Sequence, residues 1–202
     1  MFLISADYWE IQKTKEKGRG VFTKKEIKKG TIIGDYLGKV INIAEYDLDL
    51  DKYGLYLMYY SDQASIYPDV TKPGIHLFNH ACQPNCWICI YRGHTLFFAL
   101  RNIAPGEELT ISYLLSPKDD TCNPCTHDCK CGNKLCTGTM HLPKDKYEKW
   151  QKFQNEEKKK TRSEKVVFGK NLPKLTHYPE KIPDSPIYAI MSPKIEFSKK
   201  VR

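Results

Sequence analysis

Apolar residues in the first 115 positions occur in short runs that glycine and proline separate. Two of these runs, Trp87–Tyr91 and Thr95–Leu100, flank Arg92-Gly93-His94, a spacing that predicts a β-hairpin. Pro105-Gly106 precedes a further run at Glu108–Leu115, which we expect to form a strand. The pattern therefore predicts a mainly β body over residues 1–115.

A helical pattern replaces this one at Pro143. Tyr147, Trp150 and Phe153 are spaced for one face of a helix over about residues 143–160, and proline suits the first helical turn. A shorter helix is expected at Asn42–Asp51. Beyond residue 160, prolines at positions 173, 179, 183, 186 and 193 predict extended chain, either draped over the body or mobile.

Charge divides the chain into unequal parts. Residues 1–139 carry 16 basic and 16 acidic side chains, whereas residues 140–202 carry 16 basic and 8 acidic ones, which accounts for the net charge of +8. We therefore expect a neutral body (1–115), a cysteine-rich segment (116–139) and a basic extension (140–202). The extension suggests contact with nucleic acid over residues 144–202 or with an acidic partner, and a merely solvated tail is the alternative.

The apolar runs are far too short to cross a membrane, Leu96–Leu100 being typical. Asp7 and Glu10 interrupt the apolar N-terminus before a signal-peptide core could form. The sequence thus predicts a nuclear or cytoplasmic protein with no membrane partner, and a protein delivered into a host cell could look the same.

Eight cysteines are many for 202 residues, and five of them fall within fifteen positions: Cys122, Cys125, Cys129, Cys131 and Cys136. Because no export signal is evident, a thiolate metal site is favoured over a disulfide framework.

Three sequence blocks taken together point to a known family. They are Lys17-Gly-Arg-Gly-Val-Phe22 with Gly34-Asp-Tyr-Leu-Gly38, Phe78-Asn-His-Ala-Cys-Gln-Pro-Asn85, and Gly106-Glu-Glu-Leu-Thr-Ile-Ser-Tyr113 followed by Cys129-Lys-Cys-Gly-Asn-Lys-Leu-Cys136. About three-fifths of the chain resembles a SET-domain protein lysine methyltransferase with a post-SET zinc segment. The resemblance implies a mainly β fold (the β-clip or SET fold) of small antiparallel sheets with a knot-like crossing, a zinc-stapled post-SET loop and, from the pattern above, a C-terminal helix.

The resemblance also implies an activity and a cofactor. The enzyme would transfer a methyl group from S-adenosyl-L-methionine to a protein lysine. Tyr113 is implied as the hydroxyl nearest the transferred methyl and Tyr36 as a second catalytic channel residue, with Ile111 also lining the substrate channel. The cofactor would be held by Lys17, Gly18, Arg19, Tyr56, Asn79, His80 and Tyr113.

An aromatic channel suits this chemistry. A free lysine has a pKa of about 10.4 and is protonated at neutral pH, so it is not nucleophilic. A narrow apolar channel and a nearby sulfonium charge both disfavour the ammonium form. Tyrosine provides an apolar ring together with a hydroxyl that can orient the nitrogen.

The family places one structural zinc ion on four thiolates, here Cys82, Cys129, Cys131 and Cys136. The other four cysteines are Cys86, Cys89, Cys122 and Cys125. We expect no second metal, because positions 86 and 89 of a strand face opposite sides. In the alternative, Cys122 or Cys125 and not Cys82 is the fourth zinc ligand.

The substrate class follows from charge. Residues 44–69 sum to −5, and in the family this insert lines the peptide groove, so a Lys/Arg-rich substrate such as a histone or histone-like protein is expected. Ile111 lacks the phenol that can hold a water and restrict repeated methylation, which predicts di- or trimethylation. The alternative is a catalytically weak SET fold that binds peptide or, through its basic tail, nucleic acid.

Overall fold

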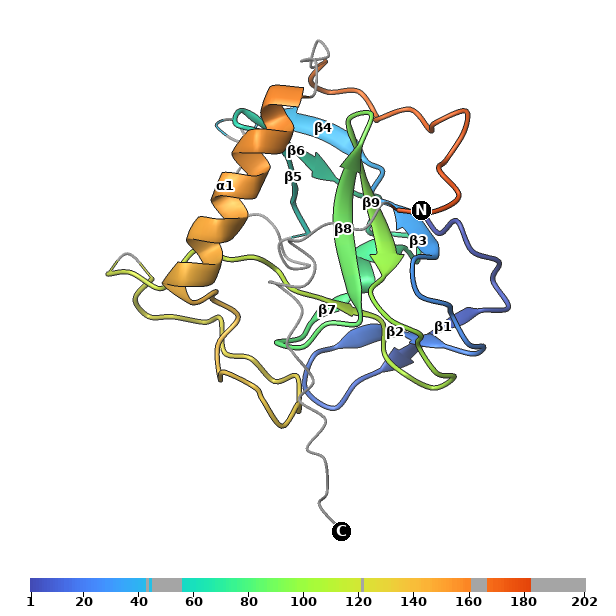
Figure 1. Cartoon of the computed structure of the whole chain (residues 1–202), viewed down its shortest axis with the longest axis horizontal. Coiled ribbons are helices and arrows are strands. Elements are labelled where there is room, and N and C mark those ends of the chain that lie inside the picture. The colour runs from blue at the N-terminus through green and yellow to red at the C-terminus, as the bar shows by residue number, and fades with distance from the viewer. Residues whose placement is uncertain (43, 45–55, 121, 161–166, 183–202) are drawn as a thin grey trace.

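The computed structural model describes residues 1–42, 44, 56–120, 122–160 and 167–182. The strands form four small sheets (Figure 1). In chain order the strands are β1 (Trp9–Lys13), β2 (Arg19–Thr23), β3 (Ile32–Asp35), β4 (Lys39–Asn42), β5 (Met58–Ser61), β6 (Ala64–Tyr67), β7 (Asn79–His80), β8 (Cys86–Tyr91), β9 (His94–Ala99) and β10 (Thr110–Ile111). The sheet orders are β1-β2, β3-β9-β8, β4-β6-β5 and β10-β7, and all pairs except β10-β7 are antiparallel. The mainly β prediction is confirmed.

The predicted hairpin is also confirmed. Strands β8 and β9 pair from Cys86↔Ala99 to Tyr91↔His94, so the turn is Arg92-Gly93 and His94 already belongs to β9. Both turn residues have positive φ, 48° and 76°, as this tight turn requires. Cys86 packs in the main core whereas Cys89 packs in a second cluster, so the two side chains face opposite sides as expected.

The main core fills the space between the sheets and the short 3-10 helix at Ile75–Leu77. Phe78 and Phe97 meet there edge to face, with ring centroids 5.5 Å apart. Both side chains are almost wholly buried. This packing fixes the position of β7, which begins at the next residue, Asn79.

The strand predicted at Glu108–Leu115 is much shorter than expected. The strand itself is limited to Thr110–Ile111, which pairs in parallel with Asn79–His80. Glu108 and Leu115 form only isolated bridges, to Phe22 and His141. The buried Asn85 side chain replaces a strand partner: its Oδ1 accepts from the Thr110 N–H at 2.9 Å, and its Nδ2 donates to the Glu108 carbonyl at 2.8 Å. These bonds bring residues 108–113 beside the Asn-His pair, two segments about 30 residues apart in sequence.

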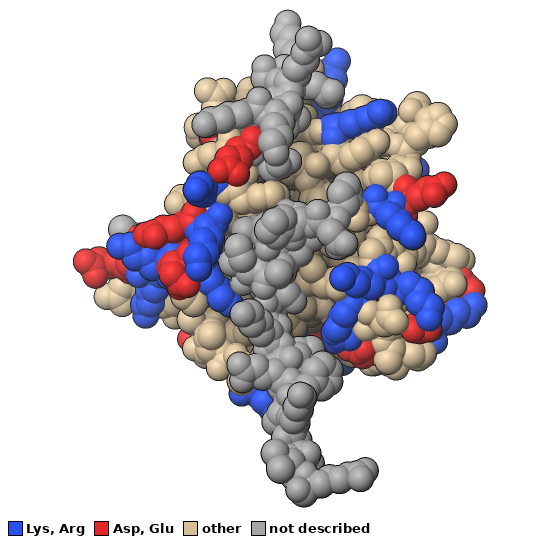
Figure 2. All heavy atoms as spheres, viewed as in Figure 1, with Lys and Arg blue, Asp and Glu red and all other residues tan. Residues whose placement is uncertain are grey.

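The predicted C-terminal helix is confirmed as α1 (Lys144–Lys160). Trp150 is buried and lies edge to face on Trp87 of β8, with ring centroids 5.8 Å apart, so the helix lies along one side of the β8–β9 hairpin (Figure 1). Basic and acidic side chains mingle over the described part of α1 at the left of Figure 2, so those residues form no uniformly basic patch. No described helix is long and apolar enough to span a membrane.

The extension after the helix drapes over the body where it is described. The Val40 N–H donates to the Lys170 carbonyl at 2.9 Å, and the Gly169 and Leu172 N–H groups both donate to carbonyls of residues 38–40 at 2.8 Å. Residues 169–172 therefore cover the outer edge of β4. The predicted helix at Asn42–Asp51 cannot begin where expected, because Asn42 is the last residue of β4. The remainder of that helix except residue 44, most of the acidic residues in 44–69, and residues 161–166 and 183–202 lie outside the described residues.

Candidate active site and metal clusters

The two predicted channel tyrosines, Tyr36 and Tyr113, both border the core around Phe78 and Phe97. Tyr36 follows β3, is buried, and donates its hydroxyl to the Tyr56 carbonyl at 2.5 Å. Tyr113 follows β10 and donates its hydroxyl to the Phe78 carbonyl at 3.3 Å. Loss of solvent raises the pKa of Tyr113 to about 12 and that of Tyr36 further, and the neighbouring phenols add to both shifts. Both hydroxyls are therefore protonated at neutral pH and can donate hydrogen bonds.

Tyr113 is nevertheless 41% exposed. Its hydroxyl sits against the backbone at Phe78, while the rest of the residue reaches the surface. Ile111, two residues earlier, is buried in the same core cluster as Tyr36. Tyr56 lies next to Tyr36, whose hydroxyl donates to its carbonyl, and its ring meets that of His76 edge to face with centroids 5.2 Å apart.

His80 positions Tyr113. The Tyr113 N–H donates to His80 Nδ1 at 3.2 Å, and the two rings meet edge to face at 5.4 Å. Burial lowers the pKa of His80 to about 4, and the charge of Lys17 acts in the same direction. The imidazole is therefore neutral at pH 7, and its Nδ1 is occupied as an acceptor, which suits a positioning role better than acid–base catalysis.

The glycine loop at residues 17–20, which leads into β2, lies beside Asn79. Gly18 adopts φ +72°, a left-handed conformation that favours glycine. The Asn79 side chain donates to the Arg19 carbonyl at 3.0 Å. A Cβ on Gly20 would lie 2.5 Å from Glu108 Oε1 and 3.0 Å from Asn79 Nδ2, so a side chain there would displace the Glu108 carboxylate.

Glu108 is a residue that sequence reasoning missed at this site. Its carboxylate forms an ion pair with Lys17 and accepts from Asn79 Nδ2 at 2.8 Å. Its neighbour Glu107 instead pairs with Arg101 at 2.5 Å. Adjacent side chains of an extended chain face opposite sides, so the sequence alone could have indicated that Glu107 and Glu108 have different partners.

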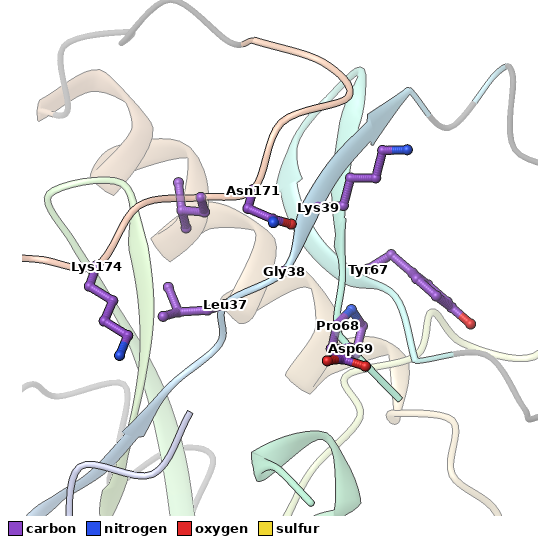
Figure 3. Close-up of a pocket in the computed structure, with 9 residues that line it drawn as sticks. Leu37, Gly38, Lys39, Tyr67, Pro68, Asp69, Asn171 and Lys174 are labelled. Atoms are coloured by element: carbon purple, nitrogen blue, oxygen red, sulfur yellow. The ribbon is translucent and has the colours of Figure 1, made fainter. Parts of the chain in front are cut away.

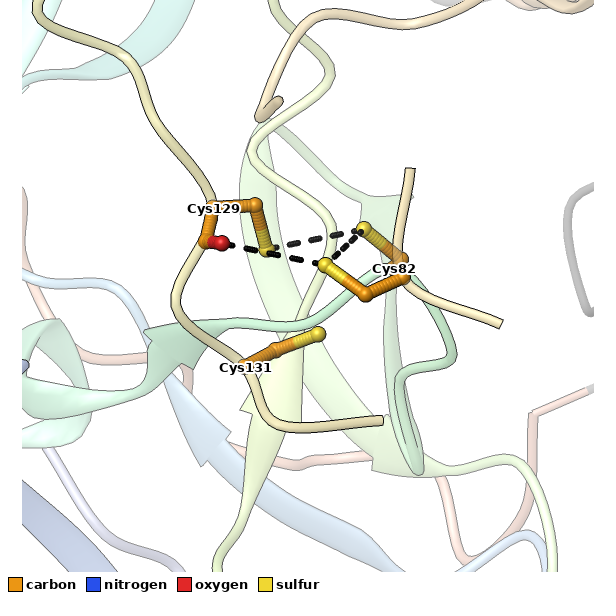
Figure 4. A group of neighbouring side chains, drawn as sticks. Cys82, Cys129 and Cys131 are labelled. Carbon is orange, nitrogen blue, oxygen red and sulfur yellow. Dashed lines mark hydrogen bonds between the residues drawn. The ribbon is translucent and has the colours of Figure 1, made fainter. Parts of the chain in front are cut away.

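The predicted zinc ligands come together as expected. The sulfur atoms of Cys82, Cys129, Cys131 and Cys136, hereafter the four-cysteine cluster, all lie within 4.8 Å of one another (Figure 4). Cys82 Sγ lies 3.5 Å from Cys129 Sγ and 3.8 Å from Cys136 Sγ. A tetrahedron with zinc–sulfur bonds of about 2.3 Å has edges of roughly 3.8 Å, so the donor set fits zinc.

Backbone groups complete the shell of the four-cysteine cluster. The Thr137 N–H donates to Cys82 Sγ at 3.5 Å, and the Gly138 N–H donates to Cys136 Sγ at 3.4 Å. Such donors stabilise thiolates. Cys82 Sγ also lies 3.7 Å from His80 Nε2, which joins the cluster to the Asn-His pair.

Cys122 and Cys125, for which the sequence predicts no metal role, lie in a second group of possible metal ligands. Their sulfur atoms and ring nitrogens of His127 and His141 form a second group in which all four ligand atoms lie within 4.8 Å of one another. Neither cysteine replaces Cys82. The sequence signal was present as Cys122-x2-Cys125-x-His127, but His141 comes from beyond the cysteine-rich segment and cannot be assigned by spacing.

A pocket of about 370 Å³ lies elsewhere, where residues 171–174 meet the start of β4 and the end of β6 (Figure 3). Lys39, Tyr67, Asp69 and Lys174 are among the residues that line it. None of the predicted catalytic, cofactor or metal residues lines this pocket.

In a comparison with known protein families, residues 18–114 match the model of the SET domain. The "Histone-lysine N-methyltransferase, H3 lysine-9 specific" of Schizosaccharomyces pombe is 35% identical over 164 residues, which cover 65% of this chain and 32% of the relative. The "Histone-lysine N-methyltransferase, H3 lysine-36 specific" of Mycosarcoma maydis is 34% identical over 141 residues, which cover 65% of this chain and 14% of the relative. The chain spans less than a third of either relative.

A solved structure shares the fold. It is the crystal structure of KRYPTONITE in complex with mCHH DNA, an H3(1–15) peptide and SAH. It matches with a TM-score of 0.54 and 22% identity, covering 66% of this chain and 29% of that one. At this identity the likeness supports the fold alone, and it agrees with the small antiparallel sheets described above.

Proposed function

We propose, from the premise that this chain belongs to the SET-domain family over residues 18–114, that it is an S-adenosyl-L-methionine-dependent protein lysine N-methyltransferase. The observation that carries the proposal is the placement of Tyr36 and Tyr113 on one aromatic core beside the Asn79-His80 pair. Tyr36 stacks on Phe97, Phe97 packs on Phe78, and the Phe78 carbonyl accepts from the Tyr113 hydroxyl. These residues come from segments far apart in sequence and converge only in this fold.

The cofactor fits the residues near Asn79. Lys17 and Glu108 provide a cation and an anion beside the Arg19 carbonyl, which complements the zwitterionic end of S-adenosyl-L-methionine. Gly18 and Gly20 keep side chains away from the adjacent backbone. When bound, the cofactor supplies an electrophilic methyl group on a positively charged sulfur. We expect Lys17, Gly18, Arg19, Tyr56, Asn79, His80 and Tyr113 to hold it.

The tyrosines would prepare the amine. The loss of solvent around the two hydroxyls would also disfavour an ammonium ion, so the substrate lysine would lose its proton to solvent water as it enters the channel. The phenol oxygens of Tyr36 and Tyr113 and the Phe78 carbonyl would then orient the nitrogen for in-line attack. No side chain of the site is needed as a permanent base, in agreement with a neutral His80.

The proposed substrate is a Lys/Arg-rich protein, a histone or histone-like protein. The relatives' names support this class but differ in the histone H3 lysine they give, 9 and 36, so the target lysine is not transferred. We propose di- or trimethylation from Ile111 and a nuclear location from the substrate class. Contact of residues 144–202 with nucleic acid is proposed from their excess positive charge.

The four-cysteine cluster would hold one zinc ion that supports the site. Its ligand Cys82 is two residues from His80, so the metal would fix the post-SET loop next to the Asn-His pair. This is a structural role for a closed four-thiolate site.

The test is methyl transfer from radiolabelled S-adenosyl-L-methionine to mixed core histones by purified, zinc-loaded protein. We expect label on histones that mass spectrometry assigns to the lysine ε-nitrogen. Asn79→Ala should weaken cofactor binding and raise the KM for the cofactor, whereas Asn171→Ala, outside the site, should not. Absence of label on any basic protein, with cofactor binding also absent, would refute the proposal.

A further inference from the structure

We propose that the chain has a second structural zinc site, formed by Cys122, Cys125, His127 and His141 and hereafter the cysteine–histidine cluster. This site is separate from the four-cysteine cluster and independent of methyl transfer. Its ligands are contributed by the cysteine-rich segment and by the residues immediately before α1. All four are partly buried or buried, as ligands of a structural metal should be.

The spacing of the ligand atoms matches tetrahedral zinc. His127 Nδ1 lies 3.4 Å from Cys122 Sγ and 3.9 Å from Cys125 Sγ. His141 Nε2 lies 3.4 Å and 3.5 Å from the same two sulfur atoms. Zinc bonds of about 2.3 Å to sulfur and 2.0–2.1 Å to nitrogen give sulfur–nitrogen edges of roughly 3.6 Å. The four measured distances cluster around that value.

Thiol–imidazole hydrogen bonds do not account for this arrangement. Each ring nitrogen has either one lone pair or one N–H in the ring plane, so His127 Nδ1 and His141 Nε2 can make one hydrogen bond each, which accounts for at most two of the four sulfur–nitrogen contacts. A metal ion accounts for all four at once. Binding would release the two thiol protons, and Zn²⁺ with two thiolates and two neutral imidazoles forms an electrically neutral site.

His141 has the outer contact that metal-binding histidines make. Its Nδ1 donates to the Ser116 carbonyl at 2.6 Å, so the proton resides on Nδ1 and the Nε2 lone pair faces the sulfur atoms. The bond also fixes the ring orientation. A second hydrogen bond joins the same two segments, since the Leu142 N–H donates to the Leu115 carbonyl at 3.1 Å.

The two clusters occupy opposite ends of one short hairpin. The Met140 N–H donates to the His127 carbonyl at 2.8 Å, and the Cys129 N–H donates to the Gly138 carbonyl at 3.0 Å. One end carries Cys129 toward the four-cysteine cluster, and the other presents His127 and His141. The second zinc would therefore connect the post-SET hairpin to residues 115–116 and to the start of α1.

Metal content and zinc K-edge absorption of the wild-type chain test the proposal without any substitution. We expect two zinc ions per chain and an average shell of three sulfur atoms and one nitrogen, from one four-sulfur and one two-sulfur, two-nitrogen site. One zinc ion with an all-sulfur shell would overturn the proposal. Two zinc ions with an all-sulfur shell would also overturn it, because Cys86 and Cys89 would then be ligands.

Substitutions locate the ions. Cys125→Ser and His141→Gln should each reduce the content from two zinc ions to one while leaving an all-sulfur shell. Cys131→Ser should also leave one ion, but with a two-sulfur, two-nitrogen shell. Cys89→Ser is the matched control, a half-buried cysteine outside both clusters, and should retain two ions. Two zinc ions in Cys125→Ser and His141→Gln would contradict the assignment.

Discussion

At the residue scale, the proposed product depends on the side chain at position 111. Ile111 is 7% exposed and belongs to the core cluster that contains Tyr36. An aliphatic side chain there offers no hydrogen bond to a water molecule, so nothing at this position would hold a partly methylated amine in an unreactive orientation.

Ile111→Tyr should therefore shift the product from di- or trimethyl lysine to monomethyl lysine. The larger ring costs about 1–3 kcal/mol of stability in a packed core, so the readout is the product ratio at saturating cofactor, by mass spectrometry, not the rate. Ile111→Val is the control and should keep the wild-type ratio. A wild-type enzyme that stops at monomethyl lysine would contradict this account of position 111.

His76 makes a pH-dependent contribution to stability. It is 9% exposed, and burial lowers its pKa to about 4, with the N-terminal charge and Arg19 acting in the same direction. Its Nε2 is buried and has no hydrogen-bond partner among the residues that the structure describes. The unfolded chain, with a histidine pKa of about 6.5, takes up this proton first as the pH falls.

The free energy of unfolding should therefore fall between about pH 6.5 and pH 4, by about 3 kcal/mol at most for this residue. His76→Gln removes the titration, so its stability should depend less on pH over this range. Urea unfolding at several pH values measures this. His177→Gln, at an exposed position, is the matched control and should follow the wild-type slope; equal slopes in all three proteins would disprove the assignment.

At the scale of elements, α1 is held by aromatic packing. Trp150 is 6% exposed, meets Trp87 edge to face, and stacks on Phe153 at 5.7 Å. The helix itself is rich in charged residues, so its attachment to the body depends on this one apolar stripe.

Trp150→Ala should lower the free energy of unfolding by about 3–5 kcal/mol, because it removes a large buried side chain at the helix–hairpin contact. Lys152→Ala, at an exposed position on the same helix, should change it by less than about 0.5 kcal/mol. Denaturant titration measures both. A loss of stability in Trp150→Ala no larger than in Lys152→Ala would mean that α1 does not dock as described.

Elements set by local pattern could be predicted from the sequence, and elements set by distant partners could not. The β8–β9 hairpin and α1 depend on periodicity and turn residues near in sequence, and both were predicted. The strand at Glu108–Leu115 was predicted too long, because the Asn85 side chain, more than twenty residues away, takes two of its backbone hydrogen bonds. The four-cysteine cluster came from a family resemblance, whereas the cysteine–histidine cluster needed the fold.

At the scale of the whole molecule, buried Asp35 joins three distant parts of the chain. Its carboxylate accepts from Tyr178 of the C-terminal extension at 2.8 Å and contacts His94 of β9 at 2.8 Å. Its carbonyl accepts from the Met1 amino group at 2.6 Å. Tyr36 is the next residue, so these contacts hold the predicted catalytic tyrosine in place. No local pattern indicates such a junction, because its partners are 34 to 143 positions apart.

The central claim is that the intact fold brings the Tyr113 hydroxyl to the place of methyl transfer. The most direct measurement compares kcat for histone methylation and the Kd for S-adenosyl-L-methionine in wild type, Tyr113→Phe and the control Tyr147→Phe on α1. We predict that Tyr113→Phe lowers kcat about 100-fold and leaves the Kd nearly unchanged, while Tyr147→Phe alters neither. A Tyr113→Phe enzyme with wild-type kcat would contradict the account.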